Sequence, residues 1–230
     1  GGCGGGAGSE GGDGAGRVWS GGRGGGGGLG WGAGGRAGSA ILSHWWVMVQ
    51  DTSQVLAAGP PVVARSLGQK ITKEDLGGVP VAVAAAGTID NAAPTEEACF
   101  AMIRRYLSFM PQNVHEAPPR RITGDPAGRI EEALLGAVPQ QRRRPYDMRR
   151  IIALIVDRDS SFEIQPDHGK ALITTLARLG GHVVGLVANN PMVYGGASNV
   201  AESTQQCHFI PPCDTFHIPL VLLLAVPGLV

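Results

Sequence analysis

Two apolar, β-branched runs near the carboxyl end constrain the fold of this chain more than any other feature. They occupy residues 182–188 and 218–226, and each has the length of a buried strand and ends at a turn with Pro and Gly. The segment between them is long enough for a crossover helix. Strand, helix and strand in this order predict an α/β unit, with ligand-binding loops at the carboxyl ends of the strands, at residues 189–191 and 226–228.

The composition excludes several function classes. The formal net charge is zero at neutral pH, so no bulk attraction to nucleic acid or to a membrane surface is implied. The last apolar run, residues 218–230, is interrupted by two prolines and is shorter than the ~20 apolar residues of a membrane span. The four cysteines lack metal-ligand spacing, and we interpret Cys207 and Cys213 as buried, reduced thiols. We expect no nucleic-acid partner, no membrane association and no metal.

The amino-terminal segment is of low complexity. Of the 37 glycines, 22 lie within the first 40 positions, which leaves too few side chains there for a packed core. The sequence therefore predicts that residues 1–30 are disordered. The Gly/Arg segment around Arg23 also resembles RNA-binding tails, and we keep RNA binding as the weakest alternative.

Helical periodicity is clearest over residues 94–110. Apolar residues recur there at i, i+3 and i+4, acidic residues open the segment, and Pro111 ends it. Five prolines punctuate residues 112–145, which we interpret as a linker. Asp147 has the position of an N-cap for a following amphipathic helix, and we predict a further helix over residues 171–179.

The motif ANNPMVYGGA at residues 188–197, followed by HFI, CDTFHIPL and VPG, resembles the second carboxyltransferase domain of biotin-dependent acyl-CoA carboxylases. These are the β subunits that act on propionyl-, methylcrotonyl- or acetyl-CoA. The resemblance extends upstream through PYDMRRIIALIVDRDSSFEI, AGPPVVARSLGQKITKEDLGG and SHWWVMVQDTSQV. It implies an α/β fold of crotonase/ClpP-like ββα units in two incomplete domains. Residues 31–111 would be the end of the first, acyl-CoA-side domain, residues 112–145 the linker, and residues 146–230 the start of the second, biotin-side domain.

The function implied by this resemblance is transfer of a carboxyl group from carboxybiotin to the α-carbon of an acyl-CoA. In such enzymes, backbone N–H groups at a Gly-rich turn form an oxyanion hole for the thioester carbonyl, because the reaction makes an enolate next to the thioester. Glycine lets the backbone approach the ligand without a Cβ. Carried over residue by residue, the catalytic positions are Gly34 and Gly35 of the oxyanion hole and Pro227 and Gly228 of an active-site loop, and the cofactor-binding positions are Asn190, Gly195 and Gly196.

The resemblance also implies partners. Biotin would be carried on a partner carrier domain, a biotin carboxylase or carrier subunit would load it, and acyl-CoA would be the substrate. Homo-oligomers are expected, because the family's site lies between the first domain of one subunit and the second domain of another. The compartment implied is the cytoplasm, or the mitochondrial matrix in a eukaryote.

The chain departs from the family pattern in the region of the acyl-CoA site and in the crossover. Ala86 stands where family members have Ser, and no His lies between Gly78 and Gly87. A Lys that is common in the crossover is replaced by Gln205. These changes remove polar groups from the expected site.

Two further departures leave a second function open. Pro211 and Pro212 fall inside the crossover, where each interior proline costs about 3 kcal/mol, so we predict that this helix breaks or shifts. Full-length members continue to a second Gly-rich turn that binds biotin, so we expect this chain to be truncated. The alternative is therefore a catalytically inactive remnant that at most binds a partner subunit.

Overall fold

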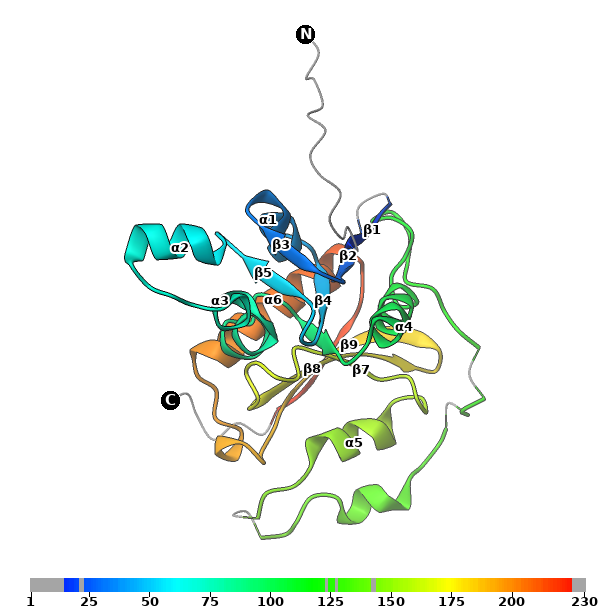
Figure 1. The fold of residues 1–230 in the computed structure, drawn as a ribbon. Coiled ribbons are helices and arrows are strands. Elements are labelled where there is room, and N and C mark those ends of the chain that lie inside the picture. The colour runs from blue at the N-terminus through cyan, green and yellow to red at the C-terminus, as the bar shows by residue number, and fades with distance from the viewer. Residues whose placement is uncertain (1–14, 21–22, 123, 127, 142–143, 225–230) are drawn as a thin grey trace.

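Strands of two sheets organise the computed structural model, which describes residues 15–20, 23–122, 124–126, 128–141 and 144–224 (Figure 1). Within these residues, one sheet has the order β1-β2-β4-β6 and comprises β1 (Ala15–Ser20), β2 (Arg23–Gly28), β4 (Trp45–Val49) and β6 (Asn91–Ala93). The other has the order β10-β9-β8-β7 and comprises β7 (Phe162–Ile164), β8 (Leu172–Leu179), β9 (His182–Asn189) and β10 (Leu220–Leu223). β3 (Trp31–Ala33) and β5 (Gln54–Leu56) form a separate parallel pair.

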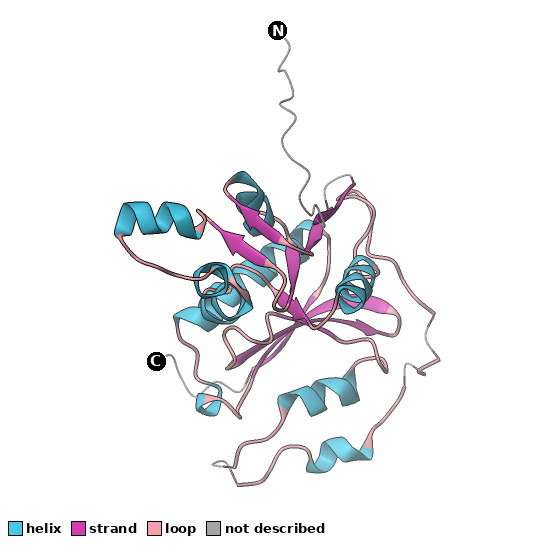
Figure 2. Ribbon diagram, viewed as in Figure 1, coloured by secondary structure: helices cyan, strands magenta, loops and turns pink. Residues whose placement is uncertain are grey.

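Helices flank these strands (Figure 2). They are α1 (Gly35–Ile41), α2 (Pro60–Leu67), α3 (Lys73–Gly77), α4 (Glu96–Leu107), α5 (Met148–Ile155) and α6 (Val200–Thr215). Three short turns of other helix types are the π-helical η1 (Pro80–Ala85) and the 3₁₀-helical η2 (Glu132–Gly136) and η3 (Tyr194–Gly196).

Strand β4 is buried on both faces, and this places the main core. It runs parallel to β2 and β6. Trp45 and Val47 face a core that also contains Phe162 of β7, whose ring centroid lies 5.6 Å from that of Trp45. Met48 faces the opposite side, where it packs with Val83 of η1. Both sheets therefore share one hydrophobic core, and the boundaries of the two predicted domains stay a prediction.

The helix predicted over residues 94–110 is confirmed as α4. The side chain of Thr95 caps it by accepting a hydrogen bond from the Ala98 N–H at 3.2 Å. Its buried residues include Ile103 and Tyr106, and the Tyr106 ring stacks on Trp45 with 4.6 Å between centroids. The predicted cap of α5 is also confirmed, since Asp147 accepts a hydrogen bond from the Arg149 N–H at 2.9 Å.

The helix predicted over residues 171–179 is wrong, because this segment is strand β8. It pairs antiparallel with β9 over its whole length, and Gly180 and Gly181 form the two-residue turn between them in left-handed conformations, at φ of 57° and 83°. Leu176 faces the core shared with β4, and Ala177 faces the core under α5. Since both faces are buried, the strand lacks the polar and apolar alternation that distinguishes a strand from a helix.

The break predicted in the crossover is also wrong. Helix α6 continues through Pro211 and Pro212 to Thr215. The prolines lie in its last two turns, where each removes one N–H that would donate to the carbonyl four residues back. Phe209 and Cys213 on the same helix are buried in the main core, and this burial stabilises the segment in spite of the prolines.

The two ends of the chain differ from the sequence-based expectation. Disorder predicted up to residue 30 is wrong for β2, which pairs parallel with β4, while residues 1–14 lie outside the described residues. Within residues 218–226 the predicted strand is confirmed as β10, parallel to β9, but its predicted burial is wrong, because it lies at the sheet edge with Leu222 53% exposed. Pro227 and Gly228 lie outside the described residues.

The thiol prediction is confirmed for one cysteine of the pair. Cys207 and Cys213 are both free thiols, with Cys213 buried and Cys207 exposed. Burial raises the pKa of Cys213 to about 12, so this thiol stays protonated at neutral pH.

Candidate functional site

The first candidate turn lies between β3 and α1. Pairing of β3 with β5 brings Ala33 opposite Leu56, and the Gly34 N–H then donates to the Leu56 carbonyl at 3.1 Å. Gly34 has a left-handed φ of 60°, and a Cβ built on it would meet no atom of the described residues within 4 Å. Gly35 follows at the first position of α1, where an N–H has no carbonyl four residues back within the helix. The turn therefore has an open backbone surface, with the Gly34 N–H already engaged.

The segment after η1 is covered by a histidine from the other half of the chain. Gly87 has φ of 61°, and a Cβ there would lie 2.4 Å from the ring of His168. The Nδ1 atom of His168 lies 3.2 Å from the Ala84 carbonyl, and the Gln165 amide donates to the Gly87 carbonyl at 2.7 Å. His168 is 7% exposed. Polar side chains thus do reach the segment beside Ala86, from residues that the sequence alone gave no reason to place there.

The second candidate turn follows the carboxyl end of β9. Asn190 is buried, its amide donates to the Lys170 carbonyl at 2.9 Å, and its side-chain oxygen accepts from the Met192 N–H at 3.2 Å. Its own N–H donates to the Ala171 carbonyl at 2.7 Å. Asn190 therefore fixes the direction in which the chain leaves the sheet.

Three consecutive left-handed residues complete this turn. Tyr194, Gly195 and Gly196 have φ of 49°, 64° and 83°. A Cβ at Gly196 would lie 2.4 Å from the buried Asn189 amide, so glycine is needed for space as well as for conformation. A Cβ at Gly195 would meet no described atom within 4 Å, and Tyr194 is 76% exposed.

Helix α6 is attached to this turn through buried polar groups. Glu202 is 3% exposed, and its carboxylate accepts from the Asn199 N–H at 2.9 Å and from the Ala171 N–H at 3.1 Å. Asn199 in turn accepts from the Ala201 N–H, which completes a capping box. One carboxylate therefore joins the start of α6 to the end of the loop before β8.

The two turns lie apart within one chain. In Figure 1, α1 is near the top of the view, whereas the short helical turn before α6 is near the bottom, on the side of the C-terminus. No hydrogen bond or ion pair of the described residues joins the two turns. A site that needs both turns is not assembled by the described residues of one chain.

A charged pair joins the two halves of the chain between these turns. The Nε2 atom of His208 on α6 lies 3.0 Å from Oδ1 of Asp90, whose other oxygen accepts from the Trp46 N–H at 2.7 Å. This hydrogen bond to Asp90 raises the pKa of His208 against the opposing effect of burial. Burial, with a smaller contribution from His208, lowers the pKa of His44 nearby.

Comparison with known proteins identifies the family. Residues 29–230 match the carboxyl transferase domain. The chain belongs to this family. The resemblance that the sequence motifs carry is thereby confirmed.

Two curated relatives and one solved structure show how much of the carboxyl transferase domain is present. The chain is 39% identical over 196 residues to methylmalonyl-CoA decarboxylase subunit alpha of Veillonella parvula, and 37% identical over 196 residues to the propionyl-CoA carboxylase carboxyltransferase subunit of Haloferax mediterranei. Each match covers 85% of this chain and 38% of the relative. The fold is similar to the hexameric transcarboxylase 12S with hydrolysed methylmalonyl-CoA bound, at a TM-score of 0.84 and 32% identity, over 88% of this chain and 40% of that one. The chain thus spans about two fifths of the length of its relatives.

Within the described part of this carboxyl transferase chain, no group of three or more His, Cys, Asp or Glu side chains comes together as metal ligands do. None of the helices there is both long and apolar enough to cross a bilayer.

Proposed function

We propose that this chain takes part in transferring a carboxyl group from carboxybiotin to the α-carbon of an acyl-CoA, with propionyl-CoA as the first substrate to test. The observation that carries the proposal is the Gly34–Gly35 turn, which the chain retains in an open, left-handed conformation at the end of a strand. Support comes from the carboxyl transferase domain match and from relatives named for propionyl-CoA and methylmalonyl-CoA.

On the acyl-CoA side, the proposed task of the turn is to stabilise negative charge on the thioester oxygen. The Gly34 N–H donates to the Leu56 carbonyl, so in this proposal Gly35 supplies the N–H that faces the substrate. Gly34 contributes by leaving the space beside the turn free of a Cβ. A fixed donor to a developing oxyanion is typically worth about 3 to 4 kcal/mol of transition-state stabilisation.

On the biotin side, the residues of the second turn fit the flat ureido ring of biotin. The backbone of Gly195 is open, and the exposed side chains of Met192 and Tyr194 flank it. Asn190 and Gly196 would act by holding this loop in place, and Pro227 and Gly228 would complete the wall beside the transferring group. Bound biotin would supply the carboxyl group itself, delivered on a partner carrier domain.

The separation of the two turns supports an oligomer. One chain presents an acyl-CoA side at α1 and a biotin side before α6, at different ends of the molecule (Figure 1). Two copies related by a rotation would bring the first turn of one to the second turn of the other. We propose that each complete site forms in this way, between subunits.

The proposal includes the finer fold and the cell compartment. The hairpin β8–β9 followed by α6 forms a ββα unit, as in folds of the crotonase/ClpP type. We propose that the chain holds parts of two such domains and works in the cytoplasm, or in the mitochondrial matrix of a eukaryote. The competing proposal is a chain that binds a partner subunit without transferring carboxyl groups.

Thermal unfolding with and without propionyl-CoA tests the acyl-CoA side. A bound ligand raises the melting temperature, because it stabilises the folded state by about 2.7 kcal/mol at one hundred times its Kd. The decisive variant is Gly35→Pro, which removes the N–H at a helical position where proline is tolerated. Gly38→Ala on the same helix is the matched control, since its Cβ meets no described atom within 4 Å.

Three outcomes separate the proposals. A ligand-dependent melt in the wild type, with carboxyl transfer reduced about 100- to 1000-fold by Gly35→Pro and unchanged by Gly38→Ala, supports the oxyanion-hole role. Binding of propionyl-CoA without any transfer by the wild type supports the non-catalytic alternative. A cooperative melt that ignores propionyl-CoA contradicts the proposed acyl-CoA site.

A further inference from the structure

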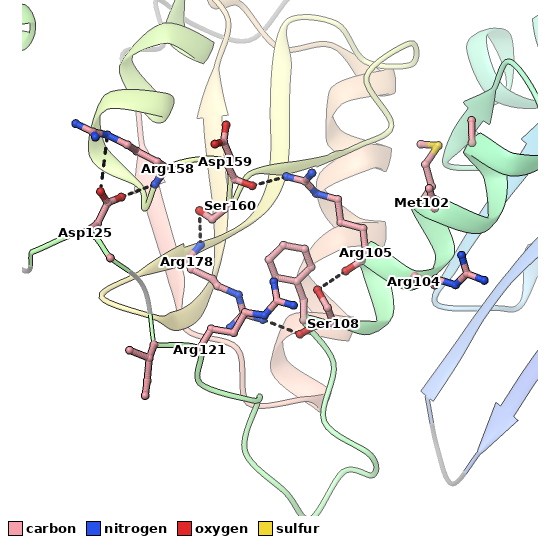
Figure 3. A pocket seen from close by; sticks show the side chains of 15 residues that line it. Met102, Arg104, Arg105, Ser108, Arg121, Asp125, Arg158, Asp159, Ser160 and Arg178 are labelled. Carbon is pink, nitrogen blue, oxygen red and sulfur yellow. Dashed lines mark hydrogen bonds and ion pairs between the residues drawn. The ribbon is translucent and has the colours of Figure 1, made fainter.

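A wide cleft lies between α4, the segment that follows it, the α5–β7 loop and β8 (Figure 3). Its volume is about 1070 Å³, and none of its lining residues belongs to either glycine turn. Basic side chains dominate its charged lining, which comprises Arg104, Arg105, Arg121, Arg158 and Arg178 with the two carboxylates Asp125 and Asp159. The full chain carries no net charge, so this excess of positive charge is a local feature.

Arg178 is built into the wall of the cleft. Its guanidinium donates to the carbonyls of Ser108 and Pro119 at 2.6 and 2.7 Å, and it lies 5.2 Å from the ring centroid of Phe109. Burial lowers its pKa, and the charge of Arg121 lowers it further. In Figure 3 the side chains of Arg121 and Arg178 lie next to each other. Two guanidinium groups that repel one another are thus held together at this wall.

A third arginine is fixed on another wall by the backbone. Arg105 of α4 donates through one nitrogen to the carbonyls of Asp159 and Ser161, at 2.7 and 2.8 Å. This geometry leaves the other guanidinium N–H groups of Arg105 without a partner among the described residues. A guanidinium held in one orientation loses less conformational freedom when it binds an anion.

The carboxylates of the cleft neutralise only part of this positive charge: Asp125 forms an ion pair with Arg158 at 3.7 Å, and two carboxylates face five arginines. Asp125 also accepts a hydrogen bond from the backbone N–H of Arg158 at 2.6 Å and forms an ion pair with Arg129 at 3.0 Å. These contacts hold Asp125 beside Arg129 and Arg158. Among the described residues, neither Arg104 nor Arg121 has a side-chain partner. Arg104 on α4 and Arg121 therefore lack an ion-pair partner among the described residues, whereas the charge of Asp157 acts on Arg178 and raises its pKa against the larger effect of burial.

The cleft also has an apolar portion, formed by Ala98, Ala101, Met102 and Phe109. We propose that this cleft binds a pyrophosphate group, as carried by a nucleoside diphosphate or by coenzyme A. Arginine forks match phosphate oxygens in pairs, and the apolar portion accommodates the remainder of such a ligand. This proposal does not rest on the proposed carboxyl transfer, because the cleft shares no residue with either glycine turn.

Titration calorimetry of the whole chain with inorganic pyrophosphate tests the proposal. The variant is Arg104→Gln combined with Arg121→Gln, because neither residue holds the fold through a side-chain contact of the described chain. Arg150→Gln is the matched control, an exposed arginine of α5 outside the cleft. A thermal melt of each variant establishes that it is folded.

We expect the double variant to bind pyrophosphate at least about tenfold more weakly, since a hydrogen bond to a charged group is worth about 1.5–3 kcal/mol. The control should bind as the wild type does, and wild-type affinity should fall at higher ionic strength. Tighter binding of ADP than of coenzyme A assigns the site to nucleotides, and the reverse order assigns it to coenzyme A. The absence of binding by the wild type, or equal binding by the double variant, would overturn the proposal.

Discussion

The two glycine turns differ in backbone conformation, with ψ of −127° at Gly34 and 14° at Gly195, and they are held in different ways. Gly34 is attached by one backbone hydrogen bond to a pair of three-residue strands. The turn at Gly195 and Gly196 is held by buried polar side chains, above all Asn190 and Glu202. The first turn, proposed for the acyl-CoA side, therefore has fewer contacts that hold it than the second turn, proposed for the biotin side.

The largest effect is expected for Glu202→Ala. This change leaves the buried Ala171 N–H without an acceptor and removes half of the capping box at Asn199. We expect a loss of about 2–4 kcal/mol in the free energy of unfolding, because an unpaired buried donor costs about 1–3 kcal/mol and a lost helix cap about 1 kcal/mol. Urea denaturation measures it, with Glu132→Ala, at an exposed position, as the control. Equal midpoints for the two variants would show that the carboxylate does not hold the second turn.

The next largest loss of stability is expected for alanine at Gly196, which is compared with alanine at the neighbouring Gly195. Gly196→Ala combines a left-handed backbone with a Cβ that overlaps the Asn189 amide, and we expect it to cost about 2–3 kcal/mol. Gly195→Ala meets only the backbone strain, at about 1 kcal/mol. The difference between their urea midpoints reports the packing contribution. If Gly195→Ala is the more damaging variant, the packing argument at Gly196 is wrong.

A smaller effect is expected at the first turn. Gly34→Ala introduces a Cβ in open space but at φ of 60° and ψ of −127°, a backbone conformation nearly exclusive to glycine, so we expect a loss of about 1–2 kcal/mol from strain alone. Gly38→Ala within α1 should stabilise the chain by about 0.5–1 kcal/mol, since alanine is the better helix former. Urea denaturation curves of both variants test whether Gly34→Ala lowers, and Gly38→Ala raises, the free energy of unfolding. A loss at Gly34 as large as that at Gly196 would remove the contrast between the turns.

The smallest effect is expected for the pH dependence of stability, which arises from the His208–Asp90 pair between the two turns. Since Asp90 raises the folded-state pKa of His208, the pair stabilises the chain fully below the ordinary histidine pKa of about 6.5. This stabilisation is lost as the pH rises through the folded-state pKa. The lowered pKa of His44 acts oppositely, with stability lost as the pH falls below about 6.5.

Comparing the wild type with His208→Gln isolates the pair. The wild type should exceed the variant in free energy of unfolding by most at acidic pH, with the difference shrinking toward alkaline pH. Urea denaturation across this pH range measures both. A difference that grows with increasing pH would contradict the assignment of the proton to His208.

Local signals predicted part of the fold. Residues 94–110 combine a helical period, a capping Thr95 and a terminating proline, and these local features suffice for α4. The hairpin was predictable as well, because two apolar runs separated by Gly180 and Gly181 are typical of a two-residue β-turn. The apolar residues on both faces of β8 also fit a helical period, and this led to the wrong prediction.

Contacts between residues far apart in the chain could not be predicted from the sequence. Glu202 contacts Ala171 across 31 residues, and His168 contacts Gly87 only after the two halves of the chain are folded together. Local propensity also overstated the effect of Pro211, because it omits the burial of the helix face around it. For the candidate site, the motifs gave the glycine positions, but the engagement of the Gly34 N–H appears only in the structure.

The most direct test of the account mixes two variants that are each inactive. Gly35→Pro disables the proposed acyl-CoA side, and Gly196→Ala disables the proposed biotin side. Carboxyl transfer to propionyl-CoA is measured with a biotin-loaded carrier for the wild type, each variant and an equal mixture. If the site forms between two copies, random pairing restores about a quarter of wild-type sites in the mixture. An inactive mixture beside an active wild type would contradict a shared site, and an inactive wild type would contradict carboxyl transfer by this chain.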